Sequence, residues 1–223
     1  MSGLIIFFFV YTTLTVLVSA VLLPRYLHSA RANRFSIGLG LIAVAFAVWS
    51  FAVVTKPAAD VLYIWVTVGL LLVLGSLLFF ISAATLDLPR QQQQIALGAG
   101  AAFAILLIVV RLFYPSSPYF SPNGYFYFGQ QPIVKLMTII LLSATIIPVV
   151  LTLARDIREK SAFAANAFIA ACFTELVGAV LLLSNTEDDF LFLVGWVMGA
   201  AFLLLVLVAA GFVERLAPAP GSR

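Results

Sequence analysis

Long apolar runs separated by short polar connectors dominate the pattern of this chain of 223 residues. A helix needs about 20 residues to cross the hydrocarbon core of a bilayer. The runs that reach this length are Gly3–Leu23, Ser36–Val54, Leu62–Thr85, Ile95–Tyr114, Ile133–Ala154, Ala162–Ser184 and Phe190–Val213. They are too long for transmembrane β-strands and show no strand alternation. The pattern therefore predicts an all-α, polytopic membrane protein, in which one domain over residues 1–223 forms a bundle of seven transmembrane helices.

The composition narrows the class further. Only 9% of the residues are charged and 64% are hydrophobic, whereas a soluble domain carries about 25% charged residues. We therefore expect the lipid bilayer, and not nucleic acid, to be the chain's main partner. The single cysteine, Cys172, and the single histidine, His28, exclude a disulfide framework within the chain and metal centres built from several thiolates or imidazoles. No metal site and no cofactor is predicted.

The basic residues predict the orientation of the bundle. Of the 12 lysines and arginines, most follow the first, third, fifth and seventh runs, and these are Arg25, Arg31, Arg34, Arg90, Arg155, Arg158, Lys160, Arg215 and Arg223. Basic connectors stay on the cytoplasmic side of a membrane. We therefore expect the N-terminus outside and the C-terminus inside, with the basic clusters in contact with lipid headgroups.

The first and last thirds of the chain carry similar charged and aromatic residues at similar positions relative to their apolar runs. Asp60 and Asp189 each precede a run, and Trp65 and Trp196 follow them at nearly the same spacing. These features indicate a 3+1+3 design, with repeats over residues 3–90 and 133–218 and a linker helix over residues 95–114. The alternative is that any seven evenly spaced helices would give similar offsets.

One carboxylate falls within a run. Glu175 lies near the middle of the sixth run, where a charged side chain costs about 2.5–3.5 kcal/mol on insertion scales. We expect it to face the interior of the bundle. It is a candidate ligand contact or proton-sensitive switch, and the alternative is a neutral carboxyl group hydrogen-bonded to another helix.

Two cations also fall within runs. Arg111 and Lys135 lie near the outer ends of the fourth and fifth runs. Both side chains are long enough to extend to the headgroups. The alternative is a cationic rim that binds an anionic ligand or pairs with acidic residues of the outer connectors, namely Asp60, Glu187, Asp188 and Asp189.

The longest connector, Pro115 to Pro132, contains a hairpin signal. An Asn-Gly turn between aromatic residues is typical of a β-hairpin. The sequence predicts a small extracellular hairpin between the fourth and fifth helices that acts either as a lid over an outward-facing pocket or as an aromatic belt. Its candidate residues are Tyr119, Phe120, Asn123, Gly124, Tyr125, Phe126, Tyr127 and Phe128. Trp49, Trp65 and Trp196 are candidate ligand contacts, or else interfacial anchors and core residues.

The motifs of membrane enzymes are missing from the sequence. It contains no HExxH, no pair of intramembrane aspartates, no Gly-Ser nucleophile motif and no nucleotide-binding loop. The seventh run has no lysine that could hold retinal as a Schiff base. We therefore predict that the protein is not an enzyme, and no catalytic residue is assigned.

The stretch Ala43–Ser50, the outer turn that ends at Asp60 and the following Tyr63-Ile64-Trp65 carry a resemblance. Together with the predicted topology, they resemble the seven-helix sensory region at the N-terminus of some bacterial histidine kinases. The resemblance implies a receptor-like protein in the inner membrane of a bacterium or archaeon that signals through helix displacement to a cytoplasmic partner.

Two other functions remain open. The 3+1+3 design is similar to that of SWEET-type sugar carriers, which implies a small-solute carrier, although those carriers have prolines in several spans and here only Pro148 lies within a run. The other alternative is a non-enzymatic accessory subunit of a membrane complex. A receptor, a carrier or an accessory subunit could each form a homo-oligomer.

Overall fold

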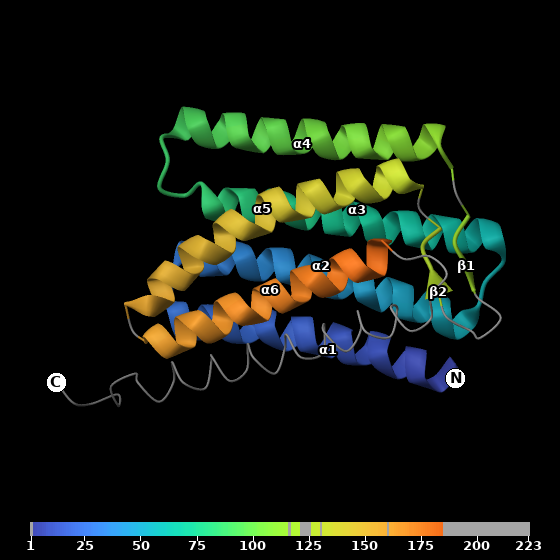
Figure 1. The fold of residues 1–223 in the computed structure, drawn as a ribbon, viewed down its shortest axis with the longest axis horizontal. Coiled ribbons are helices and arrows are strands. Elements are labelled where there is room, and N and C mark those ends of the chain that lie inside the picture. Colours follow the sequence, from blue (N-terminus) through green and yellow to red (C-terminus); the bar gives the residue numbers. More distant parts are fainter. Residues whose placement is uncertain (1, 116, 121–125, 130, 160, 185–223) are drawn as a thin grey trace.

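A computed structural model describes residues 2–115, 117–120, 126–129, 131–159 and 161–184. Within these ranges the chain is mostly helical, and successive helices run antiparallel to one another (Figure 1). The helices and strands are α1 (Ser2–Leu27), α2 (Ala30–Thr55), α3 (Ala59–Ala84), α4 (Arg90–Phe113), β1 (Tyr119–Phe120), β2 (Phe126–Tyr127), α5 (Pro132–Arg158) and α6 (Ala162–Ser184).

The first six apolar runs form helices, as the sequence predicts. Within the described residues four helices, α2 to α5, are long and apolar enough to cross a membrane, so the chain is an integral membrane protein. The last predicted run, Phe190–Val213, lies outside the described residues, and so does most of the second predicted repeat beyond Ser184.

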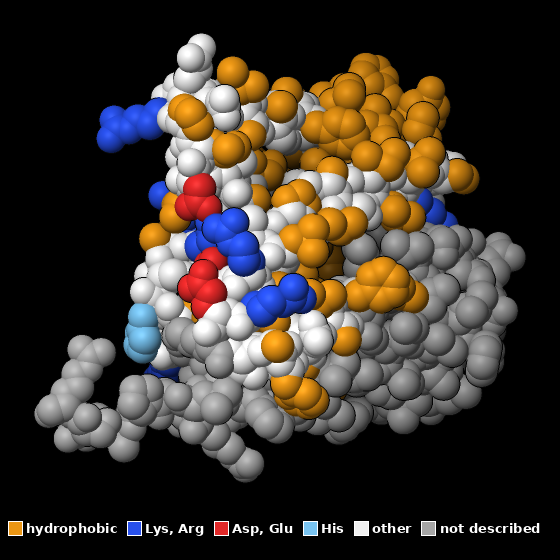
Figure 2. All heavy atoms as spheres, turned by 60° about the vertical axis from the view of Figure 1, so that its left-hand side comes forward, with side chains coloured by type: hydrophobic (Ala, Val, Ile, Leu, Met, Phe, Trp, Pro, Cys, Tyr) orange, Lys and Arg blue, Asp and Glu red, His pale blue; other side chains and the backbone are white. Residues whose placement is uncertain are grey.

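Up-and-down packing brings the connectors together at two opposite ends of the bundle (Figure 1). The α1–α2, α3–α4 and α5–α6 connectors meet at one end, which we call the Arg31 end. The α2–α3 connector and the long α4–α5 connector, which contains both strands, meet at the strand end. Charged side chains gather on the Arg31 end, whereas hydrophobic side chains spread over the flank of the bundle (Figure 2).

The helices extend beyond the apolar runs at the Arg31 end. Ser29 caps α2 by accepting a hydrogen bond from the Ala32 N–H at 3.1 Å, so α2 begins at Ala30 although the apolar run begins only at Ser36. Helix α5 likewise continues to Arg158, beyond the run that ends at Ala154. A helix does not need to end where lipid does, because polar side chains satisfy the last turn in water.

Helix α2 packs against α3 over their whole length at close range. A Cβ atom added to Gly69 of α3 would lie 2.1 Å from Trp49 Nε1 of α2, so only glycine leaves room for the indole ring. The rings of Phe35 and Phe80 meet across the same pair with their centroids 4.9 Å apart. In lipid, association rests on such close packing rather than on hydrophobic burial.

Helix α4 lies at the edge of the bundle, next to α3 and α5 (Figure 1). Its buried residues are Ala104, Leu107 and Arg111, spaced so that they form one narrow stripe. The other faces of α4 carry exposed apolar side chains such as Ile105 and Leu112. A lipid environment accounts for this exposure, because lipid tails solvate leucine and isoleucine as well as a protein core does.

Candidate functional site

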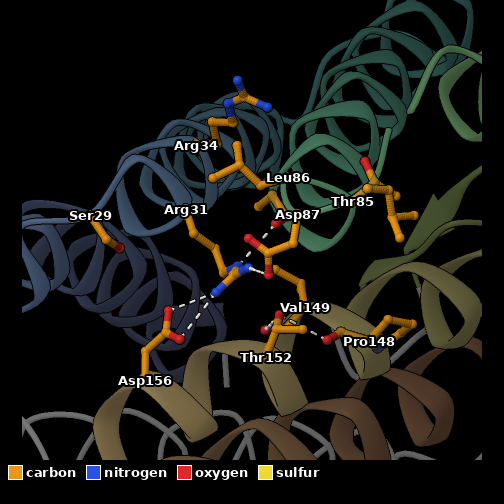
Figure 3. Close-up of polar contacts among 12 residues, drawn as sticks. Ser29, Arg31, Arg34, Thr85, Leu86, Asp87, Pro148, Val149, Thr152 and Asp156 are labelled. Carbon is orange, nitrogen blue, oxygen red and sulfur yellow. Dashed lines mark hydrogen bonds and ion pairs between the residues drawn. The ribbon is translucent and has the colours of Figure 1, made fainter. Parts of the chain in front are cut away.

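A buried arginine joins three parts of the chain at the Arg31 end. Arg31 is in the first turn of α2 and is only 5% exposed. Its guanidinium donates hydrogen bonds to both carboxylate oxygens of Asp156 on α5, at 3.1 and 2.8 Å, and to Asp87 in the α3–α4 connector. Its Nε donates to the Ala83 carbonyl oxygen at 3.2 Å. We call Arg31, Asp87 and Asp156 the Arg31 cluster (Figure 3).

The two ion pairs of the cluster differ in exposure. The Asp156 side chain is 26% exposed and the Asp87 side chain 64% exposed. Water screens an exposed pair, which is worth about 0–1 kcal/mol, whereas loss of one partner of a buried pair costs about 3–5 kcal/mol. The Arg31–Asp156 contact is therefore the stronger constraint, and it holds α2 to α5.

A second arginine fixes α2 against α3. Arg34 donates from Nη1 to the Ser82 carbonyl oxygen at 3.0 Å and to Ser82 Oγ at 2.6 Å. Arg31 and Arg34 are thus structural partners of neighbouring helices. The sequence suggested only topology and headgroup contact for these arginines, and the structure adds a role in holding the bundle together.

At the strand end, β1 and β2 pair in antiparallel fashion, with Tyr119 opposite Tyr127 and Phe120 opposite Phe126. The connecting residues Asn123, Gly124 and Tyr125 lie outside the described residues, so the predicted turn and the lid role stay predictions. Tyr119 is exposed.

The residues beside the strand pair close onto α2 and α3. Phe120 and Phe128 pack against an apolar cluster of these two helices, which we call the strand-end cluster; it consists of Ala45, Trp49, Ala52, Val53, Leu62 and Val66. The Phe128 and Trp49 rings meet edge to face, with centroids 4.7 Å apart and an interplanar angle of 68°. Trp49 therefore touches both the α4–α5 connector and α3.

Gly129 closes the base of the strand pair. Its φ is +62°, and a Cβ atom there would lie 2.1 Å from the Ser117 carbonyl oxygen. Both the left-handed backbone and the close approach to Ser117 require glycine. Glycine thereby allows the segments before β1 and after β2 to lie close together.

Arg111 is buried without an anionic partner. It lies in the last turn of α4 and is 2% exposed. Within the described part of the chain, Nε, Nη1 and Nη2 have no hydrogen-bond acceptor. The Arg111 Cζ atom lies 5.2 Å from the centroid of the Tyr63 ring on α3, a cation–π distance. The buried side chain forms no hydrogen bond with Asp60. Its pairing with Glu187, Asp188 or Asp189 stays a prediction, because these residues lie outside the described part of the chain.

The other candidate residues are scattered. Lys135, in the first turn of α5, is half-buried and forms no ion pair with a described carboxylate. Trp65 stacks on Phe51 of α2, with centroids 4.7 Å apart. Glu175 belongs to α6, but its side chain lies outside the described residues, as does all of Trp196.

Sequence reasoning did not identify Asp87 and Asp156 as functional candidates. Both are acidic residues on the end where the basic residues concentrate. An acidic residue in a connector rich in arginine suggests an ion pair, and this pattern could have identified the Arg31 cluster from the sequence. Within the described residues, no group of three His, Cys, Asp or Glu side chains could hold a metal ion.

The chain matches no protein-family model, no curated protein and no solved structure at a significant level. A functional conclusion therefore rests on the geometry of the two ends of the bundle.

Proposed function

We propose that the protein is a receptor-like membrane protein that senses a ligand at the strand end and signals at the Arg31 end. One observation carries this proposal. The single helix α2 bears Trp49, which packs against Phe128 near the strands, and Arg31, which binds Asp156 at the other end. A displacement of this helix at one end reaches the other without an intervening hinge.

The mechanism is a shift of α2 relative to its neighbours. A ligand that moves the strand pair removes or repositions Phe128, and Trp49 follows because its ring has no free space beside Gly69. Shifts of about 1–2 Å between packed helices are common in switching proteins. A shift of that size would break the 2.8 Å contact between Arg31 and Asp156, so the signalling end would change its shape.

The basic residues indicate which end of the bundle faces the cytoplasm. The described Arg25, Arg34, Arg90, Arg155 and Arg158 belong to the Arg31 end, where charged side chains gather (Figure 2). The positive-inside rule favours this end as the cytoplasmic one. The strand pair would then face outward, and a cytoplasmic partner would bind the released end of α2 or α5.

A distance measurement tests the proposal. Spin labels at the exposed positions Asn33 of α2 and Glu159 after α5, in a Cys172→Ser background in lipid nanodiscs, report the separation of the two helices at the Arg31 end. Phe128→Ala should shift or broaden this distance distribution. The matched control is Phe51→Ala, which removes a ring of the same size from α2 that contacts Trp65. An unchanged distribution in Phe128→Ala contradicts the receptor mechanism.

A further inference from the structure

Arg111 is a permanent charge for which the described residues supply no counter-charge. A guanidinium stays protonated in proteins, and burial without a partner is unfavourable. The described carboxylates do not compensate it, because Asp60 forms no hydrogen bond with it, and Asp87, Asp156 and Glu159 belong to the opposite end. The cost of this placement indicates a group that joins the guanidinium in another state of the protein.

The surroundings of Arg111 leave its donors available. The Arg111 Cζ atom lies 5.2 Å from the centroid of the Tyr63 ring, and the N–H groups of a guanidinium lie in its plane and point outward from its edge. No nitrogen of the side chain makes a hydrogen bond of normal geometry in the described part of the protein, and the Tyr63 hydroxyl is a polar group close to it. A planar guanidinium group beside an aromatic ring can donate two parallel hydrogen bonds to the two oxygens of a carboxylate or phosphate.

Among the described residues, the charged groups of the strand end are mostly cations. Lys135 and Lys56 belong to this end together with Arg111, and Asp60 is the described carboxylate there. Arg111 is also close in sequence to the segment that leads into β1, since α4 ends at Phe113 and β1 begins at Tyr119. Movement of the strand pair would therefore act on the last turn of α4, which carries Arg111.

We propose that Arg111 anchors an oxyanion-binding site at the strand end, and that the bound group is a carboxylate or a phosphate. This inference rests on the proposed function, because it names the class of ligand that the receptor takes. The oxyanion enters when the strand pair moves, and its two oxygens accept hydrogen bonds from the guanidinium edge. The group comes either from a lipid headgroup or from a soluble anion.

Thermal unfolding of the full chain in nanodiscs tests the site. Phosphatidylcholine discs titrated with sodium acetate or inorganic phosphate probe a soluble source, and discs that contain phosphatidylglycerol probe a headgroup source. Saturation with the correct anion should raise Tm by about 5 °C or more. The increase should be lost in Arg111→Gln and reduced in Arg111→Lys, which keeps the charge but not the planar fork. Lys56→Gln, at an exposed cation of the same end, is the matched control and should keep the increase.

The variant Arg111→Met distinguishes a role of Arg111 in anion binding from a role in packing. Arg111→Met keeps the apolar stem and removes an unpaired charge, so in phosphatidylcholine discs without added anion its Tm should equal or exceed that of the wild type. No increase in Tm with any of the three probes, an increase that persists in Arg111→Gln, or an Arg111→Met protein with a lowered Tm would each overturn the site.

The distance between the labels at Asn33 and Glu159 separates this inference from the proposed function. Anion binding that requires Arg111 but leaves the distance unchanged supports the site and contradicts the receptor mechanism. The opposite outcome is also informative. If Phe128→Ala changes the distance but none of the three probes changes Tm, the mechanism is supported and the site is contradicted.

Discussion

Arg31 on α2 and Asp156 on α5, 125 positions apart in the sequence, form a two-pronged ion pair in which both carboxylate oxygens accept hydrogen bonds from Nη1. The arginine is 5% exposed and the Asp156 side chain 26% exposed, so the buried guanidinium pairs with a carboxylate at the edge of the bundle end. Asp87 adds a third group from the α3–α4 connector. One side chain thereby holds three segments at the end where connectors meet.

Asp156→Ala should destabilise the protein more than Asp87→Ala. The first substitution removes the better-shielded partner of a buried guanidinium that keeps Asp87 and the Ala83 carbonyl oxygen, and it should cost about 1.5–3 kcal/mol. Loss of the exposed Asp87 should cost about 1 kcal/mol or less. The free energy of unfolding in detergent measures both effects. Replacement of the pair by Arg31→Met and Asp156→Leu should recover most of the loss. Equal costs for the two aspartates would show that exposure does not rank the pairs.

Gly129→Ala should open the strand pair. The substituted residue would need a left-handed backbone and would place its Cβ atom against the Ser117 carbonyl oxygen, at a cost of about 1–3 kcal/mol. Hydrogen–deuterium exchange should show faster exchange of the β1 amides. Gly40→Ala on α2 is the control, because no atom lies within 4 Å of the added Cβ and alanine favours a helix by about 0.5–1 kcal/mol. Unchanged exchange of β1 in Gly129→Ala would mean that Gly129 does not hold the strands.

Gly69→Ala should separate α2 from α3 near Trp49. The methyl group would overlap the indole ring at 2.1 Å, and overpacking of this kind costs about 1–3 kcal/mol. Trp49→Phe should partly rescue Gly69→Ala, because the smaller ring leaves room for the methyl group. Unfolding of the two single variants and the double variant gives the coupling energy. Additive effects would contradict a direct contact between the two positions.

The helices could be predicted from the sequence because lipid demands long apolar runs, and a run such as Ala162–Ser184 coincides with α6. Their ends could not. Hydropathy reports where lipid contact ends, whereas a helix continues into water as long as its caps allow, as with Ser29 before α2. Arg31 and Asp156 lie in these polar extensions, outside the apolar runs.

The strand-end residues were easier to find than their contacts. Turn chemistry identifies the region around β1 and β2, because an Asn-Gly pair between aromatic residues has few other uses. The contacts between the aromatic rings depend on how two helices and a connector pack. A single sequence therefore does not predict a pair such as Trp49 and Phe128. Arg111 was noticed as a cation in an apolar run, but its burial against Tyr63 follows only from the packing of α4 on α3.

The central claim is that α2 couples the strand end to the Arg31 end, and a double-mutant cycle between Phe128→Ala and Asp156→Asn tests it most directly. Distant sites without coupling give free energies of unfolding that add within about 0.3–0.5 kcal/mol. The coupling through α2 predicts a deviation larger than this, because release of either end already relaxes the helix on which the other end depends. Additive effects of the two substitutions would contradict the account.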